Sequence, residues 1–121
     1  MKIVIETIPH HEQRYVTAGD YWDDKDGVKH IRVSALGDWR MELLVVLHEL
    51  VETALCDVRG ISEADVRAFD EAHPEDTDPG ARTDSPYRRE HLFAEHVEHL
   101  IALEMGVAWK DYEERVGALF G

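Results

Sequence analysis

The segment LLVVLHELVETAL, residues 43–55, places three ionisable side chains in an otherwise apolar stretch. In a helix, His48 and Glu52 would stack on one border, because residues four apart are neighbours on a helix surface. Glu49 lies in the same broad sector. A buried carboxylate without a partner is costly, so these groups need a hydrogen bond, an opposite charge or a metal ion.

The order His-Glu-x-x-Glu predicts a metal site. His48 and Glu52 would offer one nitrogen and one oxygen ligand from adjacent turns of the helix. Glu49 would stand beside the ion as the general base for its water, as in hydrolases that carry His-Glu-x-x-His. The alternative is a histidine–glutamate pair at the edge of the core, with Glu49 in solvent.

A second polar cluster lies in YRREHLFAEHVEHLIALEMG, residues 87–106. His91 and Glu98 point the same way on a helix, with Glu95 to one side, and two such helices packed together would form a bundle metal site. The ligand types suit zinc, manganese or iron better than magnesium, and no organic cofactor motif is present. The alternative is a solvated helix face with ordinary i,i+4 pairs. The predicted metal ligands are His48, Glu52, His91, Glu95 and Glu98, and the predicted catalytic residue is Glu49.

The first third of the chain predicts β-structure. Residues 2–8, 14–22 and 28–34 are rich in β-branched and aromatic side chains. Asp26-Gly27 is a strong signal for a hairpin turn. We therefore expect a short antiparallel β-meander within residues 1–36.

The remainder predicts helices. Asp38 and Ser62 are typical N-terminal caps, and Gly106 is a typical stop. The expected helices run from Trp39 to about Val58, from Ser62 to Pro74, from Ser85 to Met105 and over residues 107–120. A loop rich in Pro, Gly and Asp, predicted to be flexible, covers residues 73–86. The predicted fold class is α+β, a single domain over residues 1–121 with a bundle of about four helices in residues 38–121.

Composition limits the partners. The net charge of −13 argues against nucleic-acid binding. No apolar run is long enough to span a membrane, and the N-terminus lacks a signal-peptide layout. Cys56 is the one cysteine, which fits a reducing compartment, so we expect a cytoplasmic protein. The expected substrate is a small molecule or a peptide, and a homodimer is left open.

Two resemblances follow from longer motifs. The succession IETIPHHEQRYVTAGDYW, IRVSALGDWRMELLVVLHELVETALC and PYRREH resembles small uncharacterised proteins of tailed bacteriophages and prophages, over most of the chain. KHIRVS followed by HELVE is similar to the core of the zincin metallopeptidases. This second resemblance implies His48 as a ligand and Glu49 as general base, with Glu52 standing where that family has its second histidine.

A third resemblance is to MazG-type nucleotide pyrophosphohydrolases, which bind magnesium through acidic motifs on two helices. Glu49 and Glu52 in HELVE match the first motif, with His48 in place of its first acid, and Glu95 and Glu98 in EHVE match the second. This implies hydrolysis of nucleoside triphosphates by a helical dimer. The sequence thus leaves three functions open: a metal-dependent hydrolase with a His/Glu site between two helices, a MazG-like enzyme, and a non-enzymatic acidic phage accessory protein that binds a protein partner.

Overall fold

A computed structural model describes all residues, 1–121, and opens with a three-stranded sheet. Its strands are β1 (Ile3–Ile8), β2 (Gly19–Asp23) and β3 (Lys29–Ser34), with β3 in the centre. Side chains alternate along β3: Ile31 and Val33 are fully buried on one face, while His30 and Arg32 lie on the other. One face of the sheet therefore packs against the core.

The sheet is mixed, which corrects the predicted antiparallel meander. β2 and β3 form the expected antiparallel hairpin, and Gly27 supplies the positive φ of 79° that its turn requires. β1, however, pairs with β3 in parallel. Residues 9–18, which include a short 3₁₀ turn at His10–Glu12, carry the chain from β1 to the far edge of the sheet. This long connection allows β3 to separate β1 from β2.

Four α-helices follow, which confirms the predicted α+β class. They are α1 (Trp39–Arg59), α2 (Glu63–Glu71), α3 (Arg88–Glu104) and α4 (Trp109–Gly117). The carboxylate of Asp38 accepts the N–H of Arg40, and the hydroxyl of Ser62 accepts that of Asp65, as expected for N-caps. Gly60 ends α1 in the left-handed conformation at φ 72°. None of the helices is long and apolar enough to cross a membrane.

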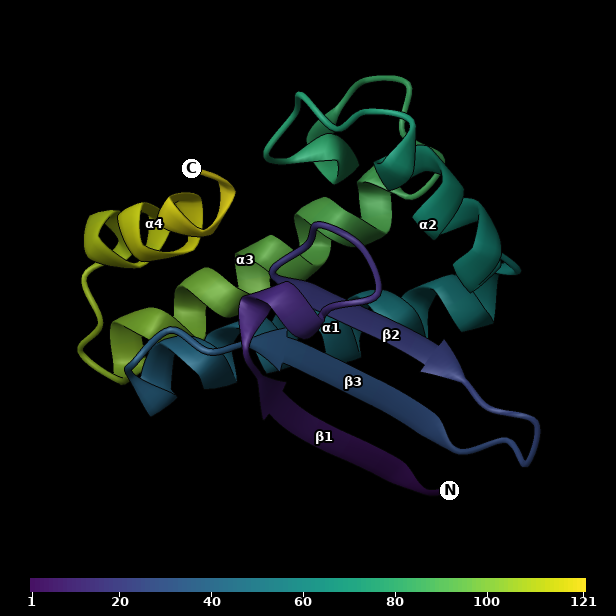
Figure 1. The fold of residues 1–121 in the computed structure, drawn as a ribbon, viewed down its shortest axis with the longest axis horizontal. Helices are drawn as coiled ribbons and strands as arrows, with labels where there is room; N and C mark the ends of the chain where they lie inside the picture. The colour runs from purple at the N-terminus through teal and green to yellow at the C-terminus, as the bar shows by residue number, and fades with distance from the viewer.

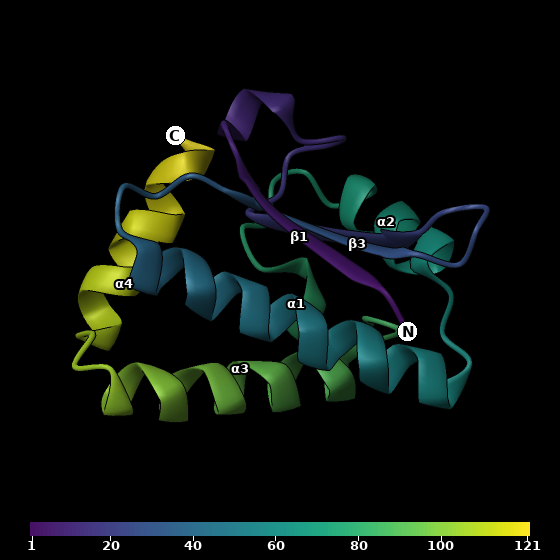
Figure 2. The same cartoon turned by 90° about the horizontal axis from the view of Figure 1, so that it is seen from below.

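The helix α1 is the central layer of the molecule. It lies between the sheet and α3, as seen edge-on in Figure 2. Leu44, for example, is completely buried. Because α1 is covered on two sides, its sequence is apolar around most of its circumference.

The remaining elements lie around α1 and α3 on the side of β2. α2 and the loop that follows it lie at one end of these helices, and α4 lies at the other (Figure 1). The loop from residue 72 to residue 87 contains a short 3₁₀ helix, η2 (Pro79–Ala81), where the sequence predicted only a flexible loop. Together these elements enclose a cavity that opens over the polar residues of α1.

Candidate metal centre

Three of the predicted ligands meet between α1 and α3. Oε2 of Glu52 lies 3.0 Å from Nε2 of His48 and 2.9 Å from Nδ1 of His91. The two ring nitrogens are 3.1 Å apart. His48 and Glu52 are buried, and His91 is largely so. The protein therefore contains a buried His/Glu group that could bind a metal ion.

The outer nitrogen of each ring meets another carboxylate. Nδ1 of His48 donates to Oε1 of Glu98 at 2.9 Å, and Nε2 of His91 donates to Oδ1 of Asp78 at 2.7 Å. In a neutral imidazole the second nitrogen is then a lone-pair donor. In that tautomer both inner lone pairs face one oxygen of Glu52, and a cation bound among the three atoms would satisfy them all. Carboxylates that orient metal-binding histidines in this way are typical of metal sites.

The same carboxylates also favour protonation of the two rings. Burial lowers the pKa of His48, but the carboxylates of Glu52 and Glu98 outweigh it and hold this pKa well above its ordinary value. Burial also lowers the pKa of His91, while Asp78 and Glu52 raise it to about 9. Conversely, the two rings overcome the effect of burial on Glu52 and lower its pKa to about 2. The pocket thus strongly favours positive charge at its centre.

The spacing of the three atoms suits a small divalent ion. Ligands held roughly 2.0–2.2 Å from a tetrahedral zinc ion lie about 3.4 Å from one another. The three distances here, 2.9, 3.0 and 3.1 Å, need to open by only a few tenths of an ångström. Two histidines and one carboxylate are a ligand set of catalytic zinc and non-haem iron sites, which keep positions open for water or substrate.

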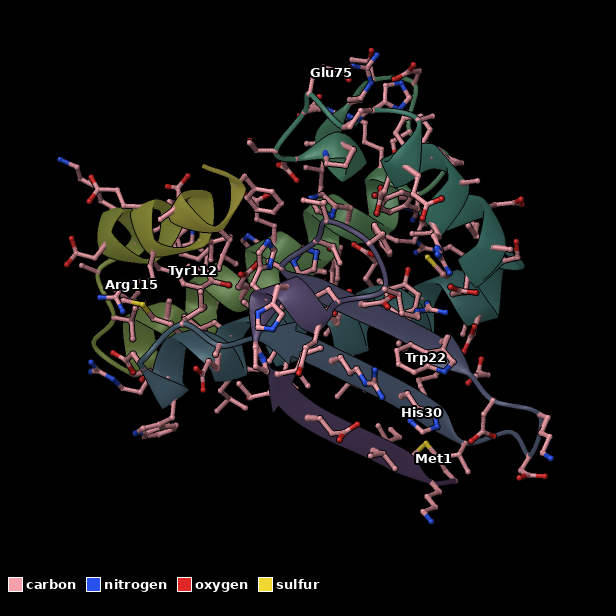
Figure 3. The ribbon with its side chains drawn as sticks, in the orientation of Figure 1. Met1, Trp22, His30, Glu75, Tyr112 and Arg115 are labelled. Carbon is pink, nitrogen blue, oxygen red and sulfur yellow. The ribbon has the colours of Figure 1, made fainter.

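Two tyrosines hold the carboxylates in place. The hydroxyl of Tyr21, on β2, donates to Oε1 of Glu52 at 3.0 Å. The hydroxyl of Tyr112 donates to Oε2 of Glu98, and Figure 3 shows Tyr112 where α4 approaches α3. Both phenols are buried. Because each tyrosine occupies the second oxygen, the first oxygen keeps a fixed direction towards the histidines.

Glu49 faces the cavity beside this centre. Its carboxyl makes no hydrogen bond and packs closely on the backbone of β2: a methyl group on Gly19 would lie 2.6 Å from Oε1 of Glu49. Burial, reinforced by the charge of Glu52, raises the pKa of Glu49 well above its ordinary value. A carboxyl with a raised pKa holds a proton more readily than an ordinary glutamate does, a property of carboxyl groups that act as general bases or acids.

The loop before α3 also shapes the site. Gly80, in η2, lies so close to His91 that an added methyl group would meet Cγ and Nδ1 of its ring at 2.6 Å. Only glycine leaves room for the ring at this position. The same loop supplies Asp78, so the residues that the sequence assigned to a flexible loop orient a candidate ligand.

The cavity has a volume of about 530 Å³, the size of an ordinary small-molecule site. It reaches from the His/Glu group across to α2 and to the C-terminal residues. Its lining is rich in acids, and Arg67 is the one lysine or arginine in it. Arg67 already pairs with Glu71 at 2.9 Å. An anionic ligand would therefore meet no unpaired lysine or arginine in this cavity.

Three of the five predicted metal ligands meet at the centre, and the other two lie outside it. His48, Glu52 and His91 lie together, whereas Glu98 lies at the outer nitrogen of His48. Glu95 lies apart from the three central atoms, in a second group with Asp78 and His91. Three further residues were not predicted as part of the site, because they come from a strand, a loop and a helix outside α1 and α3: Tyr21, Asp78 and Tyr112.

The chain matches no protein-family model, no curated protein and no solved structure.

Proposed function

We propose that this protein is a metal-dependent hydrolase whose divalent ion is held by His48, Glu52 and His91. The observation that carries the proposal is the convergence of Nε2 of His48, Oε2 of Glu52 and Nδ1 of His91, 2.9–3.1 Å apart. The outer carboxylates support it, because they direct both inner lone pairs to one point.

Zinc is the ion that we expect first, with manganese and iron as alternatives. Borderline nitrogen and oxygen ligands suit all three, and magnesium prefers sites made of oxygen alone. A bound ion of this kind lowers the pKa of water towards neutrality and polarises a carbonyl or phosphoryl oxygen.

The residues of the chain would then divide the remaining work. Glu49 takes a proton from the attacking water and returns it to the leaving group, a role that fits its raised pKa and its free carboxyl. Glu98 and Asp78 keep the two rings in the required tautomer. The cavity holds the substrate, a small molecule or a peptide segment.

The lining of the cavity favours a neutral or cationic substrate over a nucleotide. A triphosphate would approach several carboxylates, and the one arginine of the lining is already paired. We therefore expect amide or ester substrates to be cleaved faster than nucleoside triphosphates.

The test is metal content by elemental mass spectrometry, on untagged wild-type protein and on a His48→Ala/His91→Ala variant. Near-stoichiometric zinc, manganese or iron in the wild type, lost in a folded variant, supports the proposal. Protein that neither carries nor takes up these ions contradicts it.

Activity is tested next, with zinc-loaded protein on a panel of ester and amide substrates. Glu49→Gln should bind the metal as the wild type does and lose most of the turnover. His96→Ala is the control, since His96 is exposed on α3, makes no hydrogen bond or ion pair and does not line the cavity. Equal turnover in Glu49→Gln and the wild type would exclude Glu49 as the base.

A further inference from the structure

His91 presents both edges of its ring to carboxylates. Nδ1 faces Glu52 at 2.9 Å, and Nε2 faces Asp78 at 2.7 Å. Asp78, His91 and Glu95 form a second group whose three potential ligand atoms lie within 4.8 Å of one another, and Asp78 meets the ring at Nε2. The ring of His91 therefore belongs to two candidate ion sites, one on each side.

Glu95 is free to act as a ligand. It makes no hydrogen bond or ion pair, although it is partly buried and lines the cavity. It follows His91 by four residues on α3, so the two side chains are neighbours on the helix surface. This is the same spacing that places His48 beside Glu52 on α1. Each helix thus carries one His-x-x-x-Glu pair, and His91 is shared between the two ion sites.

We infer that the protein binds a second divalent cation between Asp78, His91 and Glu95, so that the centre holds two ions joined by the ring of His91. The inference deepens the proposed function and depends on the first ion being bound. When one ion is present, the proton on Nε2 points at Asp78. The second ion replaces this proton, which passes to solvent, and the ring then donates one lone pair to each ion.

The second site differs from the first in being open. Asp78 is half exposed, and Glu95 borders the cavity, so water can complete the coordination. One nitrogen and two carboxylates again suit zinc or manganese. Because the second site offers one nitrogen in a more exposed place, we expect it to bind more weakly and to fill after the first. An open ion at the edge of the cavity is well placed to meet substrate.

The experiment is a zinc titration by calorimetry of metal-free wild type, Glu95→Gln and Glu75→Gln. Glu75 is the control because it lies on the same acidic loop but projects into solvent, as Figure 3 shows. The wild type and Glu75→Gln should each bind two zinc ions, with the second ion bound at least tenfold more weakly than the first. Glu95→Gln should bind one zinc ion.

Each other outcome is decisive. One equivalent in the wild type overturns the second site and leaves the proposed function standing, whereas no binding at all defeats both. Two equivalents in Glu95→Gln show that the second ion binds elsewhere.

A spectroscopic readout tests the shared ring. With Cu²⁺ as the probe, two ions joined by the His91 ring should couple magnetically and weaken the electron paramagnetic resonance signal, and Glu95→Gln should restore the signal of an isolated ion. Two uncoupled copper ions in the wild type would overturn the shared ring.

Discussion

Replacing Glu98 by glutamine should weaken zinc binding without unfolding the protein. The carboxylate accepts the N–H of His48 at 2.9 Å and the hydroxyl of Tyr112. Glutamine keeps the shape and one acceptor oxygen but removes the charge. A hydrogen bond to a charged group contributes roughly 1.5–3 kcal/mol and a neutral one about 1 kcal/mol, so the loss is about 1 kcal/mol or slightly more. This corresponds to roughly a fivefold to tenfold weaker affinity.

Alanine at the same position removes the orienting bond altogether, and we expect a loss of roughly 10–100-fold, as is usual for such partners. The assay is competition with a chromophoric zinc chelator at about pH 9.5, above the pKa of His91. A high pH is chosen because Glu98 also helps to hold a proton on His48, and that proton competes with the metal.

Glu104→Gln is the matched control, since Glu104 is exposed near the end of the same helix and makes no ion pair. The orienting role of Glu98 is refuted if Glu98→Gln binds zinc as tightly as the wild type. It is also refuted if Glu104→Gln loses as much affinity, because the effect would then be one of net charge alone.

Four further predictions test the site and its scaffold. Gly80→Ala should lower zinc affinity at least tenfold in the chelator competition assay, because the added methyl group would displace the ring of His91. Gly117→Ala is the control and should keep the affinity of the wild type, because a methyl group there meets open space. Burial raises the pKa of Asp70 from 3.8 to about 6, so its stabilising contribution is complete below pH 4 and is lost as the pH rises through 6. Urea unfolding should show this loss, at most about 3 kcal/mol, and Asp70→Asn should remove it. Zinc affinity should rise with pH up to about 9 in calorimetry, since the ring protons compete with the ion. Leu44→Ala should lower the free energy of unfolding by about 2–5 kcal/mol in urea, because Leu44 is completely buried.

Local sequence determined most of the secondary structure. The caps Asp38 and Ser62, the stop at Gly106 and the Asp26-Gly27 turn act within a few residues, so their effects can be predicted from the chain alone. The same is true of the His-x-x-x-Glu pairs, because the helix fixes the distance between residues four apart. His48 and Glu52 were therefore predicted to be neighbours, and they are.

The pairing of the strands could not be predicted from local sequence signals. β1 lies beside β3 in parallel because the chain passes over the sheet between residues 9 and 18, and no turn motif encodes that path. Long-range register depends on which apolar faces bury one another, a property of the whole fold.

The same distinction holds for the site. The polar residues of α1 and α3 could be read from the sequence, and their helical spacing places them on one side of each helix. Only the tertiary structure decided which atoms meet: it brought Nε2 of His48 to Nδ1 of His91, turned Glu98 to the outer nitrogen and placed Glu95 with Asp78. The physical reason is that a shift of a few tenths of an ångström decides which partner a side chain contacts. The distances between atoms of different elements are set by how those elements pack together, not by the period of any one helix.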